Sequence, residues 1–96
     1  MTLAFAGCIG SAPETSLTIG AEGFEPPVAT VPAGKSFDLE VVNETRAVQT
    51  VTVASRPPLR VLPGETSTRQ IDSLRAGDYR VTLEGAPFEA TLRAEE

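Results

Sequence analysis

The side chains that most often carry out chemistry in proteins are scarce in this 96-residue chain. It contains no histidine and a single cysteine, Cys8. Without histidine, neither a Ser-His-Asp nor a Cys-His catalytic arrangement can form, and no imidazole can bind a metal. One cysteine excludes an internal disulfide, a CxxC motif and a thiolate zinc site. The sequence therefore predicts a protein that is not an enzyme, with no catalytic residue and no cofactor.

Carboxylates are the remaining candidates for metal ligands. Two glutamates flank Phe24, and two more flank the last turn that the sequence predicts: Glu22, Glu25, Glu84 and Glu89. If the four converged at one end of the fold, they could bind a hard cation such as Ca²⁺ or Fe³⁺. The alternative is a solvated acidic rim with no metal, and this alternative is the more common one.

Two basic residues, Arg56 and Arg60, bracket Pro57-Pro58, and this spacing is compatible with an anion clamp or simply with a hydrated loop. The segment Asn43-Glu44-Thr45 satisfies the N-glycosylation pattern, which also arises by chance. The net charge of −5, with eight Lys and Arg, argues against a nucleic-acid partner.

The start of the chain predicts a membrane anchor. Residues 1–8 are small and apolar, and their end, Phe5-Ala6-Gly7-Cys8, resembles a bacterial lipobox, in which the cysteine is lipidated. Residues 9–15 then read as a tether, and residues 16–96 as the folded domain. This interpretation places the protein outside the cytoplasm, in the periplasm or at the cell surface, with lipid on Cys8 holding it to the membrane. The alternative is an incidental cysteine in an irregular or misassigned start.

From Leu17 onward, apolar and polar residues alternate with period two, and turn formers such as Pro32-Ala33-Gly34 and Pro63-Gly64 interrupt them. This pattern predicts seven or eight strands in two packed sheets, little helix, and one helical turn near residues 72–76. The inward positions of the clearest strands predict a core that contains Phe37, Leu39, Val41, Val51, Val53, Tyr79, Val81 and Leu83.

Four segments, in order along residues 16–93, resemble the cupredoxin family: Gly23-Phe24-Glu25-Pro26, Val31-Pro32-Ala33-Gly34-Lys35, Pro63-Gly64-Glu65-Thr66 and Leu74-Arg75-Ala76-Gly77-Asp78-Tyr79. The resemblance implies an all-β Greek-key β-sandwich. Tyr79 also resembles the tyrosine corner of sandwich folds, which is a structural role.

Cupredoxins bind copper through two histidines, a cysteine and usually a methionine. In the register of this resemblance, the first histidine position is Gln49 and the cysteine position is Leu83. The following loop, residues 84–88, contains neither histidine nor methionine. The resemblance therefore implies the scaffold without its copper ligands.

The sequence also resembles cupredoxin-like domains of periplasmic iron-uptake lipoproteins, although Phe24 and Leu83 occupy positions where a sulfur ligand would be wanted. The leading hypothesis is a non-enzymatic, copper-free binding or structural module that is displayed from the cell envelope as a lipoprotein. An envelope protein is a candidate partner. The alternative is a carboxylate-based metal-binding domain in periplasmic iron or copper handling. A redox carrier or enzyme is the least favoured class, because the chain lacks the side chains that it would need.

Overall fold

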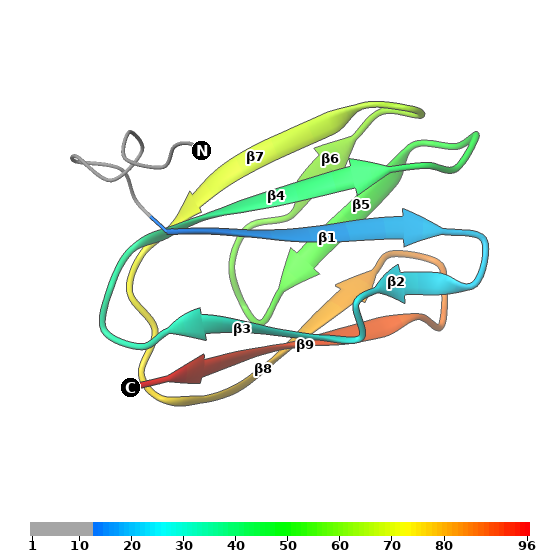
Figure 1. Cartoon of the computed structure of the whole chain (residues 1–96). Coiled ribbons are helices and arrows are strands. Elements are labelled where there is room, and N and C mark those ends of the chain that lie inside the picture. Colours follow the sequence, from blue (N-terminus) through cyan, green and yellow to red (C-terminus); the bar gives the residue numbers. More distant parts are fainter. Residues whose placement is uncertain (1–12) are drawn as a thin grey trace, which may run out of the picture.

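The computed structural model describes residues 13–96, which form two packed β-sheets (Figure 1). No helix occurs within this range. The nine strands are β1 (Glu14–Gly20), β2 (Gly23–Glu25), β3 (Val28–Pro32), β4 (Phe37–Asn43), β5 (Gln49–Val53), β6 (Leu59–Val61), β7 (Thr66–Ile71), β8 (Gly77–Leu83) and β9 (Glu89–Glu95).

The first sheet has the order β2-β1-β4-β7 and the second has the order β3-β9-β8-β5-β6. Two neighbouring pairs, β1 with β4 and β3 with β9, run parallel, and all other pairs are antiparallel. The chain crosses between the sheets several times, so that β1 and β2 belong to one sheet and β3 to the other (Figure 1). The predicted all-β sandwich of two sheets is confirmed.

Three details of the prediction were wrong. The strand count is nine rather than seven or eight, because β2 has only three residues and is too short to show a period-two pattern. β1 begins at Glu14, so its first two residues lie in the segment that was predicted as a tether. The predicted helical turn near residues 72–76 is absent, and this segment runs irregularly into β8.

The core lies between the sheets and follows the alternation of the strands. β4 alternates perfectly between buried and half-buried positions, and Phe37 and Val41 have no exposed surface. Of the eight predicted core residues, seven are buried and Tyr79 is half-buried. Asn43, at the end of β4, is the one polar residue that is fully buried within residues 13–96.

A close contact joins β2 to the turn before β9. Gly23 has φ +122°, and a Cβ built at this position would lie 3.3 Å from Cδ1 of Phe88. The backbone conformation therefore favours glycine, and a side chain at this position would also have to displace the Phe88 ring slightly. Within residues 13–96, no helix has the length and hydrophobicity of a membrane span.

Candidate functional site

The two positions at which the sequence comparison expected copper ligands lie on neighbouring strands. Val51 of β5 pairs with Leu83 of β8, and Gln49 lies two residues before Val51 on the same face of its strand. The backbone amide of Glu84 donates to Thr50 O at 3.0 Å, which continues the contact between the strands. Leu83 is buried with 4% exposure, and Gln49 is half-buried. Both positions therefore belong to the same end of the inner surface of the second sheet.

A hydrogen-bond network beside Gln49 centres on buried Asn43. The Asn43 amide donates from Nδ2 to Ala47 O at 2.8 Å and to Val61 O at 3.0 Å. Asn43 Oδ1 accepts from the Thr45 amide at 2.9 Å and from the Thr45 hydroxyl at 2.7 Å. Gln49 Nε2 donates to Thr45 Oγ1 at 3.0 Å, so the network extends to the side chain of Gln49. Every donor and acceptor of the Asn43 side chain is therefore in use.

The network changes the interpretation of the Asn43-Glu44-Thr45 pattern. Asn43 is fully buried and both of its amide hydrogens are donated, so the folded protein offers no free amide for glycosylation. The sequence contained a usable signal, because Asn43 continues the inward positions of Phe37, Leu39 and Val41. A polar residue at an inward position must find partners nearby.

The four candidate carboxylates do not converge. Glu22 and Glu25 line a hollow of about 660 Å³ together with Glu44, whereas Glu89 pairs with Arg80 at 3.5 Å on the outer face of the second sheet. No group of three or more Asp, Glu, His or Cys side chains within residues 13–96 is placed to hold a metal ion. The candidate four-glutamate cluster, which the sequence analysis considered beside the more common acidic rim, is therefore not found in the described part of the chain.

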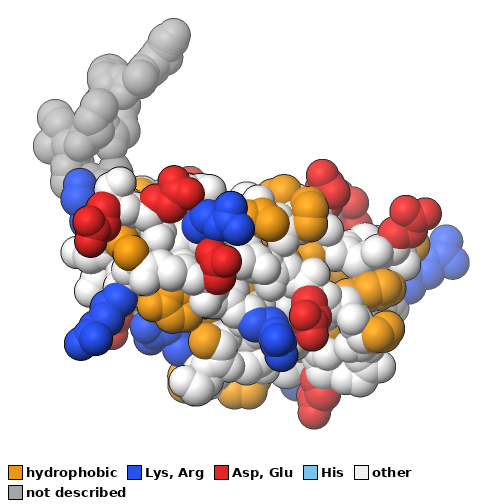
Figure 2. Space-filling model, turned by 90° about the horizontal axis from the view of Figure 1, so that it is seen from below, with side chains coloured by type: hydrophobic (Ala, Val, Ile, Leu, Met, Phe, Trp, Pro, Cys, Tyr) orange, Lys and Arg blue, Asp and Glu red, His pale blue; other side chains and the backbone are white. Residues whose placement is uncertain are grey.

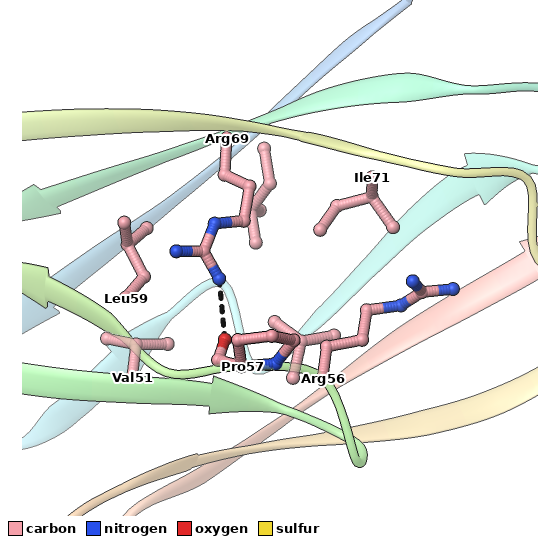
Figure 3. Close-up of a pocket in the computed structure, with 8 residues that line it drawn as sticks. Val51, Arg56, Pro57, Leu59, Arg69 and Ile71 are labelled. Atoms are coloured by element: carbon pink, nitrogen blue, oxygen red, sulfur yellow. Dashed lines mark hydrogen bonds between the residues drawn. The ribbon is translucent and has the colours of Figure 1, made fainter.

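The arginines are arranged differently from the sequence-based expectation. Arg60 is exposed on β6, where it pairs in register with Thr50. Arg56 and Arg69 line one groove, although their side chains extend in different directions (Figure 3). The Arg69 guanidinium donates from Nη1 to Pro57 O and from Nη2 to Pro58 O at 3.2 Å. Arg69, which the sequence analysis did not identify, thus lines the groove together with Arg56, and Arg60 does not.

Arg69 occupies an inward position on an edge strand. It pairs in register with buried Leu39, and it shares the inner face of β7 with Ser67 and Ile71. The alternation Ser67-x-Arg69-x-Ile71 was the available signal, but the polar character of the segment suggested only an edge strand.

Tyr79 has the contact that a tyrosine corner requires, because its hydroxyl donates to Arg75 O at 2.8 Å.

On the outer face of β8 and β9, Arg93 Nε donates to Asp78 Oδ1 at 3.0 Å. This hydrogen bond and the charge of Asp78 raise the pKa of the Arg93 guanidinium. Figure 2 shows acidic and basic side chains interspersed over the face that it presents, rather than gathered into one strong patch. The predicted lipidation site, Cys8, lies outside the described residues.

Three of the solved structures that resemble this fold show the extent of the similarity. Auracyanin from the photosynthetic bacterium Roseiflexus castenholzii has a TM-score of 0.73 and 10% identity, and the match covers 91% of this chain and 100% of that one. Auracyanin A, a blue copper protein from Chloroflexus aurantiacus, has a TM-score of 0.65 and 16% identity, with 85% and 99% covered. A chain of a heme-copper terminal oxidase dimer has a TM-score of 0.71 and 14% identity, with 88% of this chain but only 65% of its own length covered. At these identities the similarity establishes the fold alone.

No curated protein sequence matches the chain. A family model described as a cupredoxin-like domain matches residues 2–92, which is nearly the whole length. The two sheets, the parallel pairs β1–β4 and β3–β9, and the contact of Tyr79 are in keeping with that match. The chain therefore belongs to the cupredoxin-like domain family.

Proposed function

We propose that this protein is a copper-free cupredoxin-like module that acts by binding a partner at the cell envelope and not by carrying electrons. The observation that carries the proposal is the pair Gln49 and Leu83, which stand where the family resemblance expects a histidine and the cysteine. A blue copper centre needs a thiolate and two imidazoles around the metal. Leucine offers no donor atom, and the sequence contains no imidazole.

The surroundings of both side chains support this proposal. Leu83 is 4% exposed and belongs to the apolar core, so it contributes to packing as the other core residues do. The Gln49 amide is engaged with the Thr45 hydroxyl at 3.0 Å, within the network of Asn43. Both positions therefore contribute to the stability of the fold. A copper centre at Gln49 and Leu83 would have to displace these contacts.

A copper titration tests the proposal. Addition of Cu(II) at neutral pH to the full chain should give no intense visible absorption, no reversible redox couple and only copper that a chelator removes readily. The matched variant combines Gln49→His and Leu83→Cys with a histidine and a methionine inserted after Glu84, and it should gain a thiolate charge-transfer band. Tight stoichiometric copper with such a band in the unaltered protein would overturn the proposal.

The proposed location outside the cytoplasm rests on the Phe5-Ala6-Gly7-Cys8 segment and its resemblance to a lipobox. Expression of the full chain in a bacterial host, followed by membrane fractionation and mass spectrometry, tests it. Cys8→Ser should move the protein from the membrane fraction to the aqueous fraction, whereas Ser11→Ala in the same segment should not. Equal membrane partitioning of the two variants would contradict the anchor.

The carboxylate-based metal site has less support. Glu22, Glu25 and Glu44 line one hollow, but the described carboxylates form no metal-binding group, and Glu89 is paired with Arg80. We therefore favour the binding module over periplasmic iron or copper handling.

A further inference from the structure

We infer that the groove between β7 and the β5–β6 connection binds an extended acidic peptide segment of a partner protein, which adds to the free edge of β7 and places its carboxylates against Arg56 and Arg69. This inference names the partner class for the proposed interaction role and rests on it. The groove has a volume of about 300 Å³ and is lined by both Arg56 and Arg69. In Figure 3, Arg69 extends from β7 toward Pro57, and Arg56 extends away from Arg69.

The first argument concerns the backbone of β7. This strand is the edge of its sheet and pairs only with β4. Within residues 13–96, no backbone hydrogen bond outside that ladder involves residues 66–71. An edge strand presents unpaired N–H and C=O groups on alternate residues, which is the arrangement that an added strand uses. The opposite wall carries Pro57, which has no N–H and cannot donate to the ladder.

The second argument concerns the floor of the groove. It continues into a narrow apolar slot between the sheets, which is lined by core side chains including Leu39, Val51 and Ile71. The slot is too narrow for a separate apolar ligand, because its volume is about 10 Å³, which is roughly the room for one water molecule. An added strand would cover the mouth of this slot with side chains of its own, without having to enter it.

The third argument concerns charge. Arg56 and Arg69 line the groove with one acidic residue, Asp72, so the groove has a positive excess on a chain whose net charge is −5. Both arginines are half-buried. Arg69 donates only to neutral carbonyl groups, and Arg56 makes no ion pair or side-chain hydrogen bond with residues 13–96. Two positive charges without anionic partners favour a negatively charged occupant, since charge-assisted hydrogen bonds to carboxylates are the stronger kind.

A peptide with carboxylates at alternate positions fits both features, because alternate residues of a strand share one face. The probe is the peptide acetyl-Thr-Glu-Val-Glu-Thr-amide, titrated into the ¹⁵N-labelled full chain and followed by amide chemical shifts. Two matched peptides separate the contributions: Gln in place of both Glu removes the charge, and Pro in place of Val keeps the charge but removes a backbone donor.

The expected result is a set of amide shifts confined to Arg56, Leu59 and residues 66–72, with much weaker binding of both control peptides. Arg56→Gln should weaken the acidic peptide about fivefold, which corresponds to about 1 kcal/mol. Arg60→Gln, a change to the exposed arginine of β6, should leave the affinity unaltered. Urea midpoints of both variants serve to show that the fold is intact.

Several results would overturn the inference. One is binding of the glutamine peptide that equals binding of the acidic peptide. Another is equal binding of the proline peptide or of acetate, which would indicate an anion site without strand addition. A third is a set of shifts outside the groove. A concentration-dependent dimer that blocks the peptide would likewise overturn it, because the occupant would then be a second copy of the chain. The copper titration reports separately on the proposed function: a strong copper band with specific peptide binding would overturn only the copper-free role, and no band with no peptide binding would overturn only the peptide site.

Discussion

The two ends of β5 differ in how their polar side chains are paired. Near its start, beside Gln49, the buried side chain of Asn43 has all of its hydrogen-bond partners within the protein. Beyond its end, the half-buried side chain of Arg56 has no hydrogen-bond partner within residues 13–96. We refer to the first region, centred on Asn43, as the network end, and to the second, centred on Arg56 and Arg69, as the groove end. The network end is where the family resemblance expected metal chemistry, yet its polar groups serve the fold. At the groove end, of which the sequence analysis identified only Arg56, the arginines have no anionic partner within residues 13–96.

The difference teaches which region has unused binding capacity. A buried polar group that lacks a partner costs about 1–3 kcal/mol, so a fold keeps one only when it is paired. A half-exposed arginine loses much less, because water solvates it, and it stays available to a ligand. Changes at the network end should therefore mainly reduce stability, whereas changes at the groove end should reduce binding and have smaller effects on stability.

The largest expected effect is that of Asn43→Ala. The change removes four side-chain hydrogen bonds and leaves the carbonyls of Ala47 and Val61 without the amide donor, so the free energy of unfolding should fall by about 3–4 kcal/mol. Urea unfolding measures this loss. Thr68→Ala, an exposed change on β7, is the control and should cost little. A loss below about 1 kcal/mol for Asn43→Ala would show that the network is dispensable.

The next effect concerns Leu83, the position of the expected cysteine. Leu83→Ala should lower the free energy of unfolding by about 2–3 kcal/mol, because it opens a cavity in the core beside Val51. Val48→Ala lies at the same end, but Val48 is 41% exposed, and this variant should be within about 0.5 kcal/mol of the unaltered protein. Equal losses for the two variants would mean that Leu83 does not act as a core residue.

A smaller effect is expected for Arg69→Gln at the groove end. The glutamine is shorter and cannot reproduce both hydrogen bonds to Pro57 O and Pro58 O, so the loss should be about 1 kcal/mol. Hydrogen exchange should also become faster in β7, because the contact between the two sheets is lost there. Unchanged exchange together with an unchanged urea midpoint would show that Arg69 does not tie the sheets together.

The smallest effect on stability is expected for Arg56→Gln. Because Arg56 has no side-chain partner within residues 13–96, its replacement should change the free energy of unfolding by less than about 0.5 kcal/mol, while weakening the acidic peptide. A large destabilisation would assign Arg56 to the fold and remove the contrast between the two ends of β5.

Most of the fold could be predicted from local patterns. Period two in segments such as Phe37–Asn43 and Gly77–Leu83 identified the strands and their inner faces, because a half-buried strand must alternate. β2 could not be found in this way, since three residues are too few, and Gly23 is explained only by its positive φ and by Phe88 lying near it. Tyr79 was placed too deep, because the alternation indicates the face of a residue but not its distance from the rim.

The sequence by itself determined the all-β class, most of the core and the lack of imidazole, because these follow from residue types and from their spacing of two. It could not determine which polar residues meet. Asn43 and Val61, and Arg69 and Pro57, are joined only when strands distant along the chain come together, so their pairing was decided by the tertiary structure. Proximity in the sequence suggested that Arg56 and Arg60 would act on one ligand. The packing of β7 against the β5–β6 connection instead places Arg56 and Arg69 at the same groove. Hydrogen bonds depend on distance and direction in space, and a sequence records neither.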